Sequence, residues 1–356
     1  MQINFARHKS RREPTAISGY IASRMRPIIR PLTLVLARAR ALAILIAVYG
    51  IGFATPVLAI DLPAWAYPFN PPGYKPTPDD GVLRRVPGSV VIYPLSQTRD
   101  LFFAPDWHPE DHPLMPAIVA RGRMPDAYAC GFCHRATGQG GPENANITGL
   151  PFDYIVQQLR DYRAGVRTTA MPQRVPQKFM IATAKSLTDQ EINEAAAYFA
   201  QLKPRRNIRV IETDTVPKPV VANWTWVDHR SGAREAIGKR IVEVPEHLED
   251  FELRDARTTF IAYVPSGSLK RGEALVTGKL PHRVAACTSC HGADLRGMTI
   301  APPIAGRSAS YATWQLYEFK AGARTGTNAA LMKAALEKLD EDELLAIAAY
   351  LVSQTP

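Results

Sequence analysis

Two short segments of the chain each bring two cysteines and a histidine together. The segment ACGFCHRATG (129–138) holds Cys130, Cys133 and His134, and ACTSCHGADL (286–295) holds Cys287, Cys290 and His291. The chain has four cysteines in all, so each of them belongs to one of these pairs. Thiols and imidazoles at this spacing can form a disulfide, bind zinc, act as a redox motif or attach a haem.

Three of these alternatives are disfavoured by the spacing and the flanking sequence. Disulfides within two such close pairs would constrain almost none of the chain. Structural zinc typically uses two pairs about 15–20 residues apart, whereas more than 150 residues separate the pairs here. A thioredoxin-like motif follows a strand in a βαβ unit, and neither flank contains such a strand. The remaining interpretation is covalent attachment of haem at Cys-x-x-Cys-His.

The spacing also explains the chemistry. At the start of a helix, positions i, i+3 and i+4 share one face. The two cysteines of each motif can therefore form thioethers to one haem, while the histidine reaches the iron. The sequence predicts two haem c groups, attached through Cys130 and Cys133 and through Cys287 and Cys290, with His134 and His291 as proximal ligands.

An internal repeat extends well beyond the two motifs. The segment GLPFDYIVQQLRDYRAGVR (149–167) aligns without a gap with GRSASYATWQLYEFKAGAR (306–324). MIATAKSLTDQEINEAAAYFAQL (180–202) then aligns with MKAALEKLDEDELLAIAAYLVSQ (332–354). Apolar residues recur at helical spacing, glycines follow the first helix of each copy, and capping boxes (Thr188 with Glu191, Asp340 with Glu343) open the last helix.

The repeat also pairs two methionines, at positions that precede the last helix of each copy. Methionine is the sixth iron ligand of electron-transfer cytochromes c, in which it raises the reduction potential. Met332 and Met180 are therefore the predicted sixth ligands. Met171, nine residues before Met180 in the same segment, is the alternative for the first site.

With these motifs the chain resembles the bacterial two-domain dihaem cytochromes c, over roughly 111–204 and 266–356. The resemblance implies a mainly α fold with two helical haem domains in tandem, His/Met-ligated iron and electron transfer. It also implies that a proline after each motif offers its carbonyl to the proximal histidine. Pro303 in APPIAG (301–306) has that position, and Asn146 in ANITG (145–149) replaces it in the first copy.

Four further residues that the repeat pairs are candidates to support the sites: Tyr154 with Tyr311, and Arg167 with Arg324. The copies also differ, because Arg135 follows the first motif where Gly292 follows the second. Such differences close to the ligands predict unequal reduction potentials for the two haems.

The net charge of +10 lies mostly in the first 59 residues, which hold nine Lys/Arg residues and one acidic residue. The rest of the chain is close to neutral, which argues against nucleic-acid binding. A basic region, the apolar run ALAILIAVYGIGFA (41–54) and VLA (57–59) are typical of an export signal. We expect residues 1–59 to be a cleaved signal peptide or an uncleaved membrane anchor, with the rest of the chain in the periplasm.

Two segments lie outside the repeat. Residues 60–110 are rich in proline and aromatic residues, and we expect an extended arm that packs on the haem domains, with one short strand at 89–93. Residues 205–265 carry β-branched residues in partial alternation, which predicts a long interdomain linker with short strands. The haem domains themselves are expected at 111–204 and 266–356.

The favoured function is a periplasmic electron carrier, not an enzyme, with both irons six-coordinate. The resemblance implies a dehydrogenase or a quinol-oxidising complex as electron donor, and an oxidase or another cytochrome as acceptor. One alternative is a dihaem peroxidase-like enzyme, in which the first haem keeps an open or displaceable site. Another is the cytochrome subunit of a periplasmic dehydrogenase.

Overall fold

The protein is described by a computed structural model that covers residues 62–280, 285–298 and 301–356. These residues belong to one compact unit, Ala59–Pro356. The predicted leader, residues 1–59, lies outside the described residues. Within the described ranges, no helix is long and apolar enough to cross a membrane.

The first copy of the repeat forms a bundle of helices. Its elements are α3 (Ala117–Ala120), α4 (Cys130–His134), α5 (Phe152–Ala164), α6 (Val175–Ser186) and α7 (Asp189–Ala200). The helix α5 ends at Gly165, whose positive φ of 75° suits glycine at this position. The predicted capping box of Thr188 and Glu191 is present at the start of α7. The apolar faces of α5 and α7 enclose a core that includes Ile155 and Ile192.

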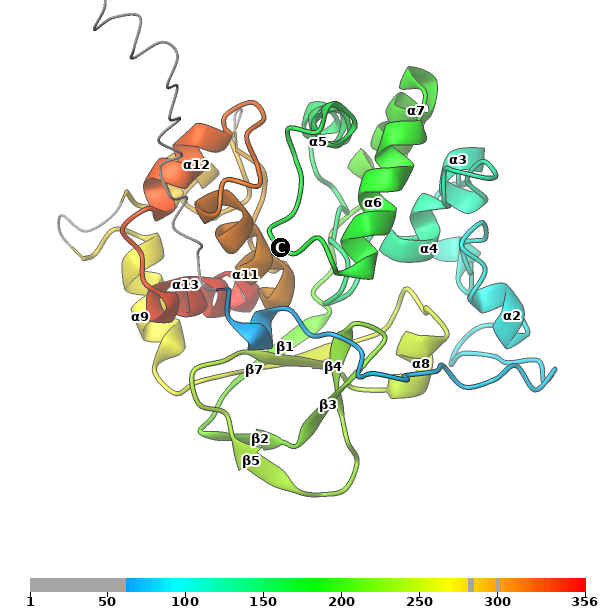
Figure 1. Ribbon diagram of the computed structural model, residues 1–356, viewed down its shortest axis with the longest axis horizontal. Helices are drawn as coiled ribbons and strands as arrows, with labels where there is room; N and C mark the ends of the chain where they lie inside the picture. The colour runs from blue at the N-terminus through cyan, green and yellow to red at the C-terminus, as the bar shows by residue number, and fades with distance from the viewer. Residues whose placement is uncertain (1–61, 281–284, 299–300) are drawn as a thin grey trace, which may run out of the picture. The chain divides into compact units, whose positions relative to one another are not determined.

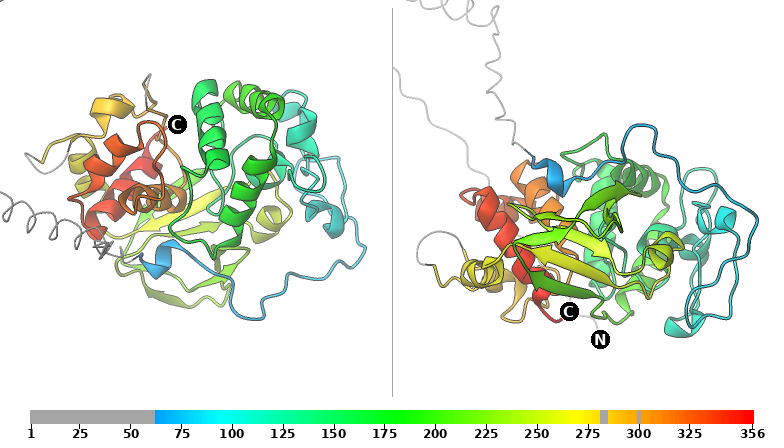
Figure 2. Two further views of the ribbon diagram at one scale, coloured as in Figure 1. Left: turned by 45° about the horizontal axis from the view of Figure 1, so that its top comes forward. Right: turned by 90° about the horizontal axis from the view of Figure 1, so that it is seen from below.

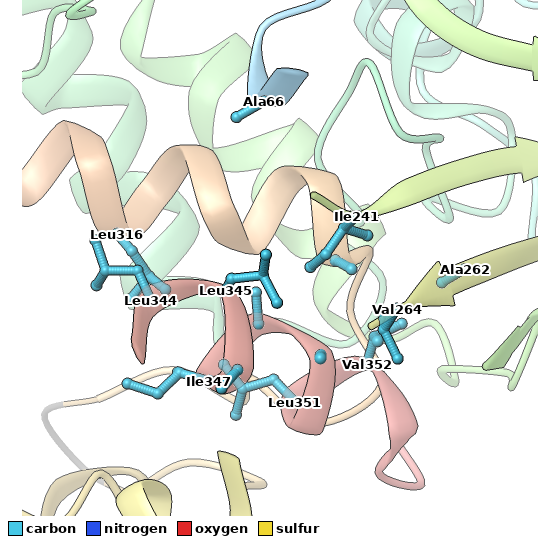
Figure 3. Close-up of a cluster of buried hydrophobic side chains, with 14 of the residues drawn as sticks. Ala66, Ile241, Ala262, Val264, Leu316, Leu344, Leu345, Ile347, Leu351 and Val352 are labelled. Carbon is cyan, nitrogen blue, oxygen red and sulfur yellow. The ribbon is translucent and has the colours of Figure 1, made fainter. Parts of the chain in front are cut away.

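The second copy repeats this arrangement. Its elements are α9 (Ser268–Val276), α10 (Thr288–His291), α11 (Ala309–Lys320), α12 (Ala329–Leu336) and α13 (Glu341–Ser353). The helices α9 and α13 cross closely because Gly272 has no side chain: a Cβ there would lie 2.1 Å from the Ala346 carbonyl oxygen. Figure 3 shows Leu345 and Val352 of α13 among the buried side chains of this copy.

The linker contains the predicted strands. They are β1 (Ile208–Glu212), β2 (Thr215–Pro217), β3 (Pro219–Ala222), β4 (Thr225–Asp228), β5 (Arg234–Ala236), β6 (Val242–Pro245) and β7 (Phe260–Val264), with α8 (Leu248–Glu252) before β7. The order β1-β7-β6 forms one sheet, with β1 parallel and β6 antiparallel to β7. Figure 1 shows these strands below the helices of both copies, and the view from below in Figure 2 shows them in front of those helices. The sheet supports the second copy, because α13 packs on β1 and α11 on β6.

The arm is ordered by contacts with both copies and with the linker. It contains η1 (Ala64–Ala66), α2 (Leu95–Thr98) and η2 (Pro109–Asp111). Tyr67 stacks on Trp314 of α11, with ring centroids 6.2 Å apart. The strand expected at 89–93 is absent, and Tyr93 instead forms a single bridge with Arg84. Aromatic rings that pack on other segments hold the arm in place, so the arm does not depend on hydrogen bonds between paired strands.

Trp107 is one of the residues that fix the arm to the linker. Its indole N–H donates to the Leu253 carbonyl oxygen at 2.8 Å, and 2% of the residue is exposed. We expect Trp107→Ala to lower the free energy of unfolding by about 3–5 kcal/mol, because a large cavity and an unpaired carbonyl remain. Chemical denaturation of the haem-loaded protein measures this loss. Val90→Ala, at an arm residue that is 88% exposed, is the matched control, and an equal loss in both variants would contradict the proposed role of Trp107.

Candidate functional site

The first Cys-x-x-Cys-His motif forms one short helix against a large cavity. Cys130 begins α4 and His134 ends it. Both cysteines are free thiols. They line a cavity of about 370 Å³ together with His134. Burial raises the pKa of the Cys130 thiol to about 12, so it stays protonated at neutral pH. A protonated, buried thiol is not the reactive thiolate that a disulfide oxidoreductase needs.

His134 is oriented by the backbone. Its Nδ1 lies 2.8 Å from the Ala145 carbonyl oxygen, to which it donates as the Nδ1–H tautomer. Burial lowers the pKa of His134, although this hydrogen bond works in the opposite direction. The imidazole is therefore neutral at physiological pH, with Nε2 left as the free lone pair. This is the state that a metal ligand requires.

The second motif repeats this geometry on α10. Cys287 is the N-cap residue of α10 and His291 is its last residue. The Nδ1 atom of His291 lies 2.8 Å from the Pro302 carbonyl oxygen, and burial lowers the pKa of His291 as well. Burial also raises the pKa of the Cys287 thiol to about 11. Both motifs thus present two free thiols and one neutral, oriented imidazole to the same cavity.

The prediction of which carbonyls orient the two histidines was wrong by one residue in each copy. The acceptors are the carbonyls of Ala145 and Pro302, rather than those of Asn146 and Pro303. In the first copy the carbonyl that follows the acceptor has a different partner. The Asn146 carbonyl accordingly accepts from Arg307 at 2.9 Å.

The structure separates the two candidate methionines of the first copy. Met180 lies within α6 and lines the cavity that His134 lines. Met171 instead packs against the apolar core of the second copy. Met332 lies within α12 and lines the cavity together with His291. Each copy therefore brings a histidine and a thioether to one apolar cavity, from two different helices.

A polar junction between the copies joins the four residues that the repeat pairs. Arg167 donates to the Tyr311 hydroxyl at 3.1 Å, and Arg324 lies at 3.5 Å from the Tyr154 hydroxyl. Each arginine thus reaches the tyrosine of the other copy, which sequence reasoning did not foresee. The backbones of the two arginines are also bridged in antiparallel fashion.

Two glutamines complete this junction and were missed in the sequence. The Gln158 side-chain oxygen accepts from Arg167 at 2.9 Å and from Arg324 at 2.6 Å. The Gln315 side-chain oxygen accepts from Arg324 at 2.7 Å and from Arg167 at 3.1 Å. The repeat contained the signal that could have revealed them, because Gln158 and Gln315 are identical residues at aligned positions.

A further arginine ties the second copy to the first. Arg307, of which 6% is exposed, donates from Nη1 to the Asn146 side-chain oxygen at 2.8 Å and from Nη2 to the Thr148 carbonyl oxygen at 3.1 Å. Burial lowers the pKa of Arg307 to about 10, so the guanidinium remains charged at neutral pH. Asn146 therefore serves the contact between the copies through both its backbone and its side chain.

The donor set fits a haem at each motif. Two thiols and a neutral imidazole on one helix match the attachment points and the proximal ligand of haem c. A thioether on the opposite element matches the sixth ligand. Arg167 and Arg324 line the cavity, and each donates to an uncharged glutamine side chain. Two buried cations are suited to bind the carboxylates that a haem carries.

Comparison with known proteins agrees with this chemistry. The family model described as Cytochrome c matches twice, at residues 120–203 and 270–355. Cytochrome c-554(548) of Halomonas halodenitrificans (strain ATCC 12084 / NCIMB 8669) is 37% identical over 73 residues, which span 20% of this chain and 88% of that protein.

Two longer relatives match about two thirds of the chain. Cytochrome c4 of Azotobacter vinelandii is 28% identical over 247 residues, 67% of this chain and 90% of that protein. The thiosulfate dehydrogenase electron acceptor of Thiomonas intermedia (strain K12) is 26% identical over 233 residues, 65% of this chain and 80% of that protein. The chain belongs to the cytochrome c family, as a dihaem electron-transfer cytochrome with two covalently bound haem c groups in tandem domains.

Proposed function

We propose that this cytochrome is a periplasmic electron carrier in which a histidine and a methionine would hold each haem iron. The proposed thioether positions are Cys130, Cys133, Cys287 and Cys290, and the proposed iron ligands are His134 with Met180 and His291 with Met332. These four thiols would hold the two haems by addition of each S–H across a vinyl group, which would need no oxidant. The observation that carries the proposal is the shared cavity, to which both copies bring a neutral, oriented histidine and a methionine.

When bound, each haem supplies a one-electron ferric/ferrous couple. The chain's residues then set how that couple behaves. The carbonyls of Ala145 and Pro302 hold the imidazole rings in one orientation. The methionine thioethers favour the reduced iron and so raise the potential. Apolar residues such as Leu159 and Ile347 line the cavity and exclude water.

The relatives support a carrier rather than an enzyme. The two longer relatives are named as a cytochrome and as an electron acceptor, and neither name describes catalysis. The second name favours a dehydrogenase as the class of electron donor, with an oxidase or another cytochrome as acceptor. The leader pattern supports the periplasm. We assign the two haem domains to 111–204 and 266–356, joined by the linker 205–265 and preceded by the arm 60–110.

Reductive titration tests the carrier function. Anaerobic addition of dithionite to the ferric protein should consume two electrons per chain, one for each Cytochrome c domain. Mixing the reduced protein with an excess of a ferric monohaem cytochrome c should return both electrons. Rapid, repeated turnover of hydrogen peroxide by the reduced protein would contradict the proposal and favour the peroxidase-like alternative.

A further inference from the structure

The two haem motifs have unequal surroundings although the repeat aligns them. Gly131 and Phe132 in the middle of the first motif are buried, and Phe132 is 5% exposed. The aligned Ser289 and the adjacent Cys290 of the second motif are exposed. The same contrast continues after the motifs: Ala136, Thr137 and Gln139 are buried, whereas the aligned Ala293, Asp294 and Arg296 are exposed.

The arm covers the first motif from one side. The Leu101 carbonyl oxygen accepts from the Ala129 N–H at 2.9 Å, directly before the motif. The next contact is so close that a Cβ on Gly131 would lie 2.7 Å from the Ala104 Cβ. The Ala104 N–H in turn donates to the Ala120 carbonyl oxygen at 2.8 Å. Residues 101–104 therefore lie directly on the helix that carries Cys130 and Cys133.

A row of aromatic rings continues this cover to the mouth of the cavity. Phe102 of the arm contacts Tyr128 with ring centroids 5.2 Å apart, and Tyr128 contacts Phe179 of α6 at 5.1 Å. Tyr128 and Phe179 both line the cavity. These three rings, which we call the aromatic cap, connect the arm to the helix that carries Met180.

The linker covers the other side of the first motif. The Arg254 guanidinium lies over the Phe132 ring, 3.7 Å from its centroid, and its Nη1 donates to the Phe132 carbonyl oxygen at 3.2 Å. Arg254 follows α8, so the first motif is enclosed by two segments that lie outside the repeat.

The second copy has no counterpart of the aromatic cap at the aligned positions. Ala285 aligns with Tyr128 and Leu331 aligns with Phe179; both are exposed, and both line the cavity. Leu331 is 59% exposed. Ser289 and Cys290 line the cavity as well and are also exposed. These four uncharged residues form the open mouth of the second site.

We propose that this open mouth is the surface on which a redox partner docks, and that the first site exchanges electrons with partners through the second. The inference rests on the proposed electron-carrier function. One electron leaves the partner and reduces the second site; it then passes to the first site, and the second site is oxidised again. The partner class is a small soluble redox protein whose own cofactor edge lies in an apolar face, because the mouth residues Ala285, Ser289, Cys290 and Leu331 carry no charge.

Flash reduction of the ferric, haem-loaded protein by a neutral flavin semiquinone tests access to the two sites. We expect a first phase whose rate is proportional to flavin concentration and a second phase that is independent of it. Leu331→Trp should slow the first phase several-fold because the indole covers the mouth. Leu114→Trp is the matched control, since Leu114 is 96% exposed on the segment before α3, and it should leave both phases unchanged.

Opening the first site provides the converse measurement. Phe102→Ala and Tyr128→Ala each remove part of the aromatic cap, and in either variant the second phase should become proportional to flavin concentration. Phe102→Ala changes only an arm residue, so it serves if Tyr128→Ala fails to fold. Two phases that are both proportional to flavin concentration in the unmodified protein would overturn the inference.

Docking is tested with a ferric monohaem cytochrome c as the acceptor. Leu331→Glu should slow oxidation of the reduced protein several-fold, and Leu114→Glu should not. Equal rates in both variants would place the docking surface elsewhere and overturn the proposal. Failure of the electron-carrier function itself would be distinct, since it would appear as a high-spin ferric spectrum before any kinetic measurement.

Discussion

Replacing Met180 by alanine is expected to convert the first haem from a low-spin, six-coordinate site to one with an open position. The reduction potential of that haem should fall by an amount on the order of 0.1 V, because axial ligands account for much of the range of haem potentials. The reduced variant should also bind carbon monoxide at one site per chain. Visible spectra and a redox titration of the purified variant measure these changes.

The neighbouring methionine provides a matched control. Met171 packs against the core of the second copy and does not line the cavity. Met171→Ala should therefore keep both haems low-spin and leave their potentials unchanged, with some loss of stability from the smaller side chain. If Met171→Ala produced the open site and Met180→Ala did not, the assignment of the sixth ligand would be reversed.

Replacing Arg254 by leucine is expected to lower the potential of the first haem and to leave the second unchanged. Arg135 is buried and Arg254 is half-buried beside the first motif; the aligned position of Arg135 holds Gly292 in the second. Burial lowers the pKa of Arg254 to about 10, so it still carries its charge at neutral pH. A positive charge near the iron disfavours the ferric state. A change of roughly 1 kcal/mol for such a charge corresponds to a fall of about 40 mV for a one-electron couple.

A conservative substitution distinguishes the effect of the Arg254 charge from the effect of its contact with Phe132. Arg254→Lys keeps the cation, although it loses the planar contact with Phe132. Its first-site potential should stay close to that of the unmodified protein, while Arg254→Leu shifts it. Equal shifts in both variants would show that the contact with Phe132, rather than the charge, sets the potential. The titration must follow the two haems separately.

The haem motifs, the repeat and the capping boxes could be predicted because each is a local pattern. Cys130 to His134 fit on one turn of helix, and the box of Asp340 and Glu343 at the start of α13 depends on residues three apart. The expected strands of the linker followed from the same kind of local alternation. The carbonyls that accept from the two histidines were predicted one residue too late in the chain. Their direction depends on the conformation of the loop backbone, which the presence of a proline or an asparagine does not determine.

The contacts between distant segments could not be predicted from local patterns. Arg167 reaches Tyr311, 144 residues away, and Arg254 reaches Phe132, 122 residues away. Such pairs arise only after the copies, the arm and the linker have packed. For this reason the sequence showed two similar haem motifs, whereas the folded chain buries Gly131 and Phe132 of the first and leaves Ser289 and Cys290 of the second exposed.

The ferric near-infrared and ferrous visible spectra of the full haem-loaded protein, with and without carbon monoxide, test the central claim most directly. We expect two low-spin haems, each with the charge-transfer band of an Fe(III)–methionine bond, and no binding of carbon monoxide. One high-spin haem, or rapid carbon monoxide binding by half of the sites, would contradict it. The first domain would then be a candidate catalytic centre, and Met180 would not be an iron ligand.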